Sequence, residues 1–168
     1  FDIVVLGGGS AGYATAVRAV QLGMTAAIVE KDKLGGTCLH RGCVPTKALL
    51  HTAEVADSAK ESETFGVDAE FKGIDIDKVL EYKTNVINRN YKGLQGLIKA
   101  RGIDTYLGDG KLVGKDQVEV TGADETYTLT GKNILLSTGS TSKTLGLDVT
   151  DRVLTSTEAL ELTTVPKS

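Results

Sequence analysis

The 168-residue sequence has no tryptophan, one methionine, two prolines and two cysteines. Two cysteines cannot form the dense disulfide framework of a small secreted protein. No apolar run approaches about 20 residues, which excludes a transmembrane helix and argues against a membrane partner. The net charge of −3 gives no excess of basic residues to neutralise phosphates, so we expect no nucleic-acid partner.

The chain does have the composition of an ordinary globular protein, with 40% hydrophobic and 24% charged residues. Together with the length, this composition predicts one folded domain with a buried core. Glycine is abundant, at 20 residues, and indicates tight turns and close backbone contacts. No signal-peptide pattern precedes the first apolar run, and we expect a cytoplasmic protein.

The first 30 residues have the pattern of a strand, a glycine-rich turn, a helix and a second strand. Residues 1–6 and 25–30 are short apolar runs rich in β-branched side chains, and residues 13–22 place alanine and valine at helical spacing. Elements in this order form a βαβ unit with a parallel strand pair. The predicted fold class is therefore α/β: a Rossmann-like domain with a central parallel sheet and helices on both faces.

The remaining segments predict two long helices and a small antiparallel meander. Helices are expected over residues 43–63 and 76–100, the second capped by Asp75, with a shorter helical stretch at 156–162. Short strands are expected at residues 67–71, 103–107, 117–121 and 126–130, of which the last three would form the meander. Residues 132–137 predict a further buried strand. The apolar stripe of the long second helix comprises Ile76, Val79, Leu80, Val86, Ile87, Leu94, Leu97 and Ile98.

The glycine-rich turn has the spacing of a dinucleotide-binding site. Gly7, Gly9 and Gly12 match G-x-G-x-x-G, and Glu30 ends the next predicted strand. The glycines permit the tight turn, the approach of a pyrophosphate and close packing of helix on strand, while Glu30 can accept hydrogen bonds from a ribose. An acid at position 30 repels a 2′-phosphate, so the site suits FAD or NAD rather than NADP. An empty structural turn is the alternative.

Cys38 and Cys43 lie five residues apart. In a straight helix this spacing separates the Cα atoms by more than about 8 Å, too far for a disulfide. A bridge therefore needs either a distorted turn, which Gly42 would allow, or a Cys38 that lies before the helix begins. We expect Cys43 near a helix start, where the helix dipole lowers the thiol pKa and favours a reactive thiolate. One alternative is zinc with His40 and His51, but the spacing fits no common zinc site and we expect no metal. The other is a pair of inert buried cysteines.

The segment around these cysteines resembles the redox-active disulfide motif of the flavoprotein pyridine nucleotide-disulfide oxidoreductases, G-G-T-C-x₄-C-x-P-[ST]-K. The Ala-Leu pair that follows the motif is similar to the dihydrolipoamide dehydrogenase branch of that family. The resemblance extends over essentially the whole chain, and Ser137 stands where the family usually has alanine. The matching residues of the motif are Gly35, Gly36, Thr37, Cys38, Gly42, Cys43, Pro45, Thr46 and Lys47.

The resemblance implies an enzyme that oxidises dihydrolipoyl groups and passes the electrons through a Cys38–Cys43 disulfide and bound FAD to NAD⁺. Both cysteines would be catalytic: Cys38 as the interchange thiol that attacks substrate, and Cys43 as the charge-transfer thiolate against the flavin. Lys47 would lie near the flavin N5. The cofactor-binding residues that the resemblance implies are Gly7, Gly9, Ser10, Ala11, Gly12, Glu30, Lys31, Gly36, Thr37, Cys38, Cys43, Lys47, Gly110, Thr138, Gly139 and Ser140.

The resemblance also implies a parent protein larger than this chain. Residues 1–168 would form the N-terminal, incomplete part of an FAD-binding domain, without the NAD-binding and dimerisation domains, so we expect no NAD-linked turnover from this chain alone. The parent would be a homodimer acting in cell redox homeostasis, with the lipoyl domain of a 2-oxoacid dehydrogenase complex as its partner. Two alternatives stay open: a non-enzymatic truncated flavin-binding fragment, or a parent of the mercuric or glutathione reductase type.

Overall fold

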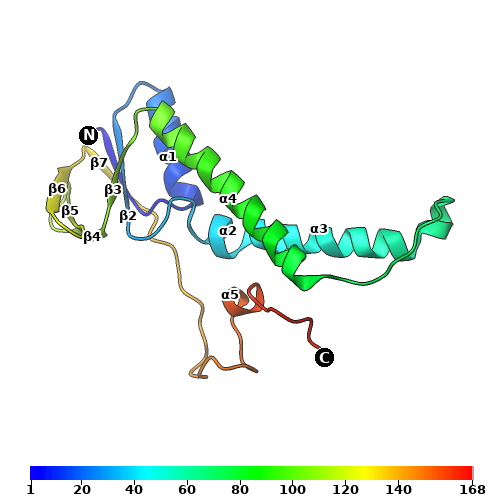
Figure 1. The fold of residues 1–168 in the computed structure, drawn as a ribbon. Coiled ribbons are helices and arrows are strands. Elements are labelled where there is room, and N and C mark those ends of the chain that lie inside the picture. Colours follow the sequence, from blue (N-terminus) through cyan, green and yellow to red (C-terminus); the bar gives the residue numbers. More distant parts are fainter. Residues whose placement is uncertain (168) are drawn as a thin grey trace. The chain divides into compact units, whose positions relative to one another are not determined.

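The structure, a computed structural model, describes residues 1–167 and divides into two compact units. The sheet unit combines Phe1–Cys38 with Asn90–Thr141, and the helical unit combines Leu39–Arg89 with the described residues from Ser142 onward. In chain order (Figure 1) the elements are β1 (Ile3–Leu6), α1 (Ser10–Gln21), β2 (Ala26–Glu30), α2 (Gly36–Arg41), α3 (Cys43–Lys60), η1 (Ser62–Phe65), α4 (Ile76–Ala100), β3 (Asp104–Leu107), β4 (Asp109–Leu112), β5 (Gln117–Thr121), β6 (Thr126–Thr130), β7 (Asn133–Leu136) and α5 (Ser156–Ala159).

The sheet unit is built on a parallel sheet with the strand order β3-β2-β1-β7. β1 pairs in parallel with β2 and β7, and β2 pairs in parallel with β3. The predicted βαβ unit of the first 30 residues is confirmed, since α1 connects the paired strands β1 and β2. A second sheet, with the order β4-β5-β6, is antiparallel.

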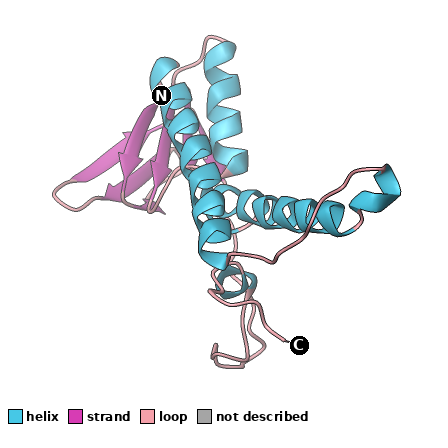
Figure 2. Ribbon diagram, turned by 45° about the vertical axis from the view of Figure 1, so that its right-hand side comes forward, coloured by secondary structure: helices cyan, strands magenta, loops and turns pink. Residues whose placement is uncertain are grey.

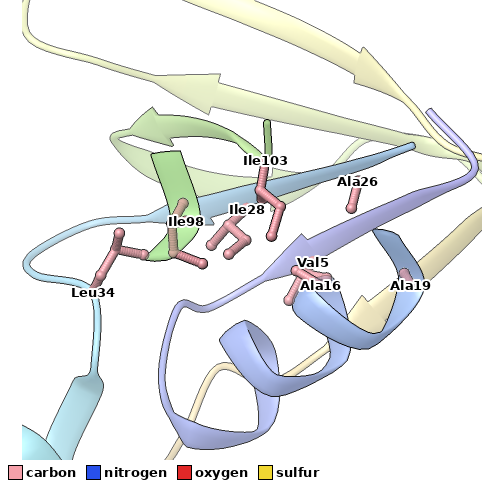
Figure 3. Close-up of a cluster of buried hydrophobic side chains, with 8 residues drawn as sticks. All are labelled: Val5, Ala16, Ala19, Ala26, Ile28, Leu34, Ile98 and Ile103. Carbon is pink, nitrogen blue, oxygen red and sulfur yellow. The ribbon is translucent and has the colours of Figure 1, made fainter. Parts of the chain in front are cut away.

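Helices cover one face of the parallel sheet. Val5 of β1 and Ile28 of β2 are fully buried there, in one cluster with Ala16 and Ala19 of α1 and with Ile98 near the end of α4 (Figure 3). The small alanine side chains let α1 lie close to the strands. Burial of each valine or isoleucine contributes about 1.5–3 kcal/mol to folding.

The antiparallel sheet covers the other face (Figure 1). Val118 and Val120 of β5 are fully buried and pack in one cluster with Leu6 of β1 and Val29 of β2. β5 can cover this face because its valines alternate with more exposed polar residues, which gives the strand one apolar side. The predicted α/β class with a central parallel sheet is confirmed. The prediction of helices on the second face is wrong for residues 1–167, because the small antiparallel sheet covers that face instead.

Two strand predictions are also wrong. Residues 104–107 form β3, which pairs in parallel with β2 rather than opening the meander, and β4 is the first antiparallel strand. β3 lies at the edge of its sheet and exposes Asp104 and Thr105, so its polar sequence resembles that of a meander strand. The strand expected at residues 67–71 is not formed, since the chain there has no regular structure after η1.

The helical unit contains α3, the first part of α4 and α5, joined by irregular segments (Figure 2). Pro45 lies in the first turn of α3, where its missing N–H has no helical partner to lose. Asp75 caps α4 as predicted, because its Oδ1 accepts a hydrogen bond of 3.3 Å from the backbone N–H of Lys78. No helix within residues 1–167 is long and apolar enough to cross a membrane.

Candidate functional site

The carboxyl ends of β1, β2, β3 and β7 meet at one edge of the parallel sheet. From β1 the chain proceeds outward to β2 and β3 on one side, whereas β7 lies on the other side. The strand order therefore changes direction next to β1, and ligands of open α/β sheets bind in the crevice at such a point. The glycine-rich turn follows β1 directly and so occupies this position.

The turn is too tight for side chains at two of its glycines. Gly7 has φ +105°, and a Cβ there would lie 2.2 Å from the carbonyl oxygen of Ser137. A Cβ on Gly12 would lie 1.9 Å from the carbonyl oxygen of Gly7. The spacing of these glycines thus follows from the close approach of β1, α1 and the end of β7.

The N-terminus of α1 is open for an anion. Gly9 is the N-cap residue, and no side chain caps the helix there. Ser10 and Ala11, the first residues of the helix, are exposed, and the first turn carries no acidic side chain. The backbone N–H groups of such a turn, together with the positive end of the helix dipole, bind phosphate groups.

Glu30 ends β2 and connects the turn with the following loop. Its Oε2 accepts a hydrogen bond of 2.7 Å from the N–H of Gly8, and its Oε1 accepts one of 2.8 Å from the N–H of Asp32. These bonds fix the carboxylate beside the turn, where its remaining lone pairs can accept hydrogen bonds from ribose hydroxyls. Lys31 follows as an exposed residue.

The loop after β2 brings the first cysteine close to the glycine turn. The N–H of Gly35 donates a 2.9 Å hydrogen bond to the carbonyl of Gly8. Gly36 has φ +58°, and a Cβ on it would lie 2.7 Å from the Cα of Gly9. Thr37 and Cys38 follow at once in α2, so Cys38 lies two residues from this contact.

Cys38 and Cys43 are both disulfide-bonded, and as the chain's two cysteines they are bonded to each other. The expected break lies at Gly42, whose backbone (φ −146°, ψ −108°) separates α2 from α3. Cys43 is the first residue of α3, as predicted. The sulfurs engaged in this bond are not thiolate ligands for a metal, which removes the zinc alternative for the oxidised protein.

The other predicted site residues lie on three separate elements. Lys47 is an exposed residue of α3 in the helical unit. Thr138, Gly139 and Ser140 are exposed and follow β7 at the edge where the strand ends meet. The Cα of Thr138 lies 3.2 Å from the position that a Cβ on Gly7 would take.

Gly110 lies in β4, where a Cβ would come within 2.3 Å of the Leu6 side chain. Close packing of the two sheets therefore requires glycine at position 110, and its predicted contact with adenine stays a prediction.

Ser137, which stands where the family usually has alanine, was not predicted to be a site residue. Its hydroxyl has one proton to donate and shares it between the carbonyls of Gly7 (3.0 Å) and Leu6 (3.3 Å). The Ser137 side chain thus connects the end of β7 with the end of β1 and the glycine turn. The serine at a position where the family usually has alanine was the feature of the sequence that could have pointed to this contact.

The strand order, the glycine turn at the switch point and the open helix N-terminus define a Rossmann-like nucleotide-binding fold. The sequence profile of the pyridine nucleotide-disulphide oxidoreductases matches residues 1–168. The chain belongs to this family of enzymes.

Relatives in this family share the whole of the chain. It is 42% identical over 179 residues to a dihydrolipoyl dehydrogenase of Bacillus subtilis (strain 168), covering 100% of this chain and 38% of the relative. It is 40% identical over 168 residues to a dihydrolipoyl dehydrogenase of Geobacillus stearothermophilus, covering 99% of this chain and 36% of the relative. The chain thus spans less than two fifths of the length of these curated relatives.

A solved structure, that of LpdA from Mycobacterium tuberculosis, has the same fold. It matches with a TM-score of 0.86 at 22% identity, over 98% of this chain and 38% of that one. The HOCl-induced flavoprotein disulfide reductase RclA from Escherichia coli matches with a TM-score of 0.79 at 24% identity, over 99% of this chain and 35% of that one.

Proposed function

We propose that this chain is the FAD-binding and disulfide-bearing part of a dihydrolipoyl dehydrogenase. The observation that carries the proposal is the contact between Gly36 and Gly9, because it brings a redox-capable disulfide next to a dinucleotide-binding turn. The relatives at 40–42% identity support the lipoyl class, since both are dihydrolipoyl dehydrogenases.

The residues at the sheet edge fit the ADP part of FAD. The N–H groups at the start of α1, at Ser10, Ala11 and Gly12, would bind the pyrophosphate. Glu30 would accept hydrogen bonds from the adenosine ribose, and its negative charge favours a 2′-hydroxyl over a 2′-phosphate. The remaining predicted FAD contacts are Gly7, Gly9, Lys31, Gly36, Thr37, Lys47, Gly110, Thr138, Gly139 and Ser140.

The two cysteines have separate roles in this proposal. When the disulfide is reduced, Cys38 is the thiol that exchanges with the substrate and Cys43 is the thiolate that faces the flavin. The position of Cys43 as the first residue of α3 supports its role, because a helix N-terminus stabilises a thiolate. Bound FAD would supply the two-electron chemistry that links this disulfide to NAD⁺. The charge of Lys47, one turn further along α3, would favour reduced flavin.

The substrate would be the dithiol of a dihydrolipoyl group on the lipoyl domain of a 2-oxoacid dehydrogenase complex. Oxidation of that dithiol to its cyclic disulfide releases two electrons and two protons, which reduce the Cys38–Cys43 disulfide to two thiols. NAD binding and homodimer formation would belong to further domains of the whole enzyme, and we propose that residues 1–168 are one incomplete FAD-binding domain. A cytoplasmic location stays a prediction.

The substrate class can be tested by the rate of flavin reduction. The chain is loaded with FAD and mixed anaerobically with dihydrolipoamide or with reduced glutathione, and the flavin absorbance is followed. We expect dihydrolipoamide to reduce the flavin at least about tenfold faster than glutathione does, which corresponds to a difference of about 1.4 kcal/mol in activation free energy. The rate with dihydrolipoamide should saturate as its concentration is raised. Cys38→Ser is the matched control, and we expect it to abolish reduction of the flavin by dihydrolipoamide. Equal rates with glutathione would contradict the lipoyl assignment, and bound flavin that dihydrolipoamide does not reduce would contradict the proposed link between the disulfide and the flavin.

A further inference from the structure

Lys83 is buried within the apolar stripe of α4. Its side chain is only 2% exposed and it is the largest fully buried side chain among the described residues. It lies one turn from Val79 and Ile87 and therefore on the same face of the helix. A residue that only fills space at such a position is normally apolar, because removing an ammonium group from water is costly unless hydrogen bonds compensate.

The compensation comes from the end of α5, 77 residues later in the chain. The Lys83 Nζ donates a 2.6 Å hydrogen bond to the carbonyl oxygen of Leu160 and lies 2.9 Å from Oε1 of Glu161. Leu160 is the C-cap residue of α5. Carbonyls at a helix C-terminus lack helical partners and carry the negative end of the dipole, so a cation is the matching group.

α5 needs such support because it has only four residues. Helices this short do not persist in water on their own. Its N-terminus is capped locally, where the Thr155 side chain accepts a hydrogen bond from the N–H of Thr157 and the Glu158 carboxylate accepts one from the N–H of Thr155. The preceding segment, residues 141–153, is exposed throughout and contains no helix or strand.

We propose that Lys83 is a positioning residue whose ammonium group holds α5 on α4 and so fixes the end of the exposed segment 141–153. This segment directly follows the Thr138–Ser140 loop. If the proposed function holds, Lys83 therefore fixes, within the helical unit, the far end of the segment that follows the flavin loop.

Hydrogen exchange of the α5 amides, followed by mass spectrometry on a peptide covering residues 155–162, tests the proposal on this chain without FAD. Lys83→Met keeps the length and the apolar stem but removes the charge. We expect it to accelerate exchange in α5 about tenfold, since charge-assisted hydrogen bonds to a buried ammonium group are strong, and to leave peptides from β1 and β2 unchanged. Lys78→Met is the matched control: Lys78 lies on the same helix with its side chain 81% exposed, and its loss should leave exchange in α5 unchanged.

Two further variants keep the test decisive. Lys83→Arg retains the charge and donors and should restore exchange in α5 to within about threefold of the parent. Glu161→Gln changes an exposed side chain, cannot prevent folding, and should accelerate the same amides several-fold. Unchanged exchange in α5 for both Lys83→Met and Glu161→Gln would overturn the proposal. So would equal acceleration across α3, α4 and α5, because that pattern indicates general destabilisation. Neither result depends on FAD binding, so failure of this proposal and failure of the proposed function are distinguishable.

Discussion

Gly36 and Gly9 lie so close that a Cβ on Gly36 would come within 2.7 Å of the Gly9 Cα. Gly9 belongs to the glycine-rich turn after β1, and Gly36 is the first residue of the helix that carries Cys38. One backbone contact thus joins the glycine-rich turn to the disulfide-bearing segment. The positive φ of +58° at Gly36 adds a second reason for glycine at this position.

Gly36→Ala is therefore expected to destabilise the protein. The added methyl group meets backbone, which cannot move aside cheaply, and alanine is strained at this φ. We expect a loss of about 1–3 kcal/mol in the free energy of unfolding, measured by urea denaturation. Gly96→Ala is the control, since Gly96 lies within α4 with open space around it and alanine favours a helix. Equal stability of the two variants would show that the Gly36–Gly9 contact is not tight.

Glu30→Gln tests the anchoring of the carboxylate beside the turn. Both oxygens of Glu30 accept backbone N–H donors, from Gly8 and Asp32. The glutamine NH₂ group would face one of these N–H donors, so one hydrogen bond is lost. Its loss lowers the free energy of unfolding by about 1–2 kcal/mol. We expect the FAD dissociation constant, measured from flavin fluorescence, to rise about tenfold. Glu81→Gln changes an exposed residue of α4 and should leave the dissociation constant unaltered; the same value for both variants would remove Glu30 from the FAD site.

Asp2 gives the sheet unit a pH-dependent stability. Its carboxylate accepts hydrogen bonds from Lys132 Nζ (2.7 Å) and from the N–H (2.8 Å) and hydroxyl (2.9 Å) of Thr25. These bonds, that of Lys132 foremost, hold the pKa of Asp2 well below its usual value. A lowered folded-state pKa gives stability that is fully present above the unfolded pKa of about 4 and is lost as the pH falls through the folded value.

Asp2→Asn should therefore lower the melting temperature at pH 7. The difference from the parent protein should shrink as the pH is lowered below about 4, because the parent then loses the same interaction. Glu70→Gln removes an exposed pair with Lys72 and should change the melting temperature little at any pH. A constant difference between parent and Asp2→Asn from pH 7 to pH 2 would contradict the role of the ionised carboxylate.

The parts that sequence predicted are those governed by local rules. The apolar runs of β1 and β2 predicted buried strands, and the spacing of Gly7, Gly9 and Gly12 predicted the turn between β1 and α1. The apolar run at residues 132–137 predicted the strand β7 but not its exposure, since none of its residues is buried. Gly42 next to Cys43 predicted the break that permits the disulfide. Each of these features depends on residues near one another in the chain.

The parts that sequence missed depend on distant partners. β3 is a strand of the parallel sheet because β2 lies beside it, and its own polar residues give no sign of this. The antiparallel sheet replaces helices on the second face because Val118 and Val120 meet the side chains of β1 and β2. Lys83 lies at an apolar position of α4 and is explained only by Leu160 and Glu161, 77 and 78 residues later.

In the proposed function the Cys38–Cys43 disulfide works together with a bound flavin, and the visible absorption spectrum is the first measurement to make. The FAD-loaded chain is recorded before and after reduction by one equivalent of dithiol, alongside Cys38→Ser and Cys43→Ser. We predict a long-wavelength charge-transfer band in the reduced parent protein, a band without reduction in Cys38→Ser, and none in Cys43→Ser, because in the proposed function the Cys43 thiolate faces the flavin. A flavin-loaded protein that shows no such band in the parent or in either variant would contradict the claim.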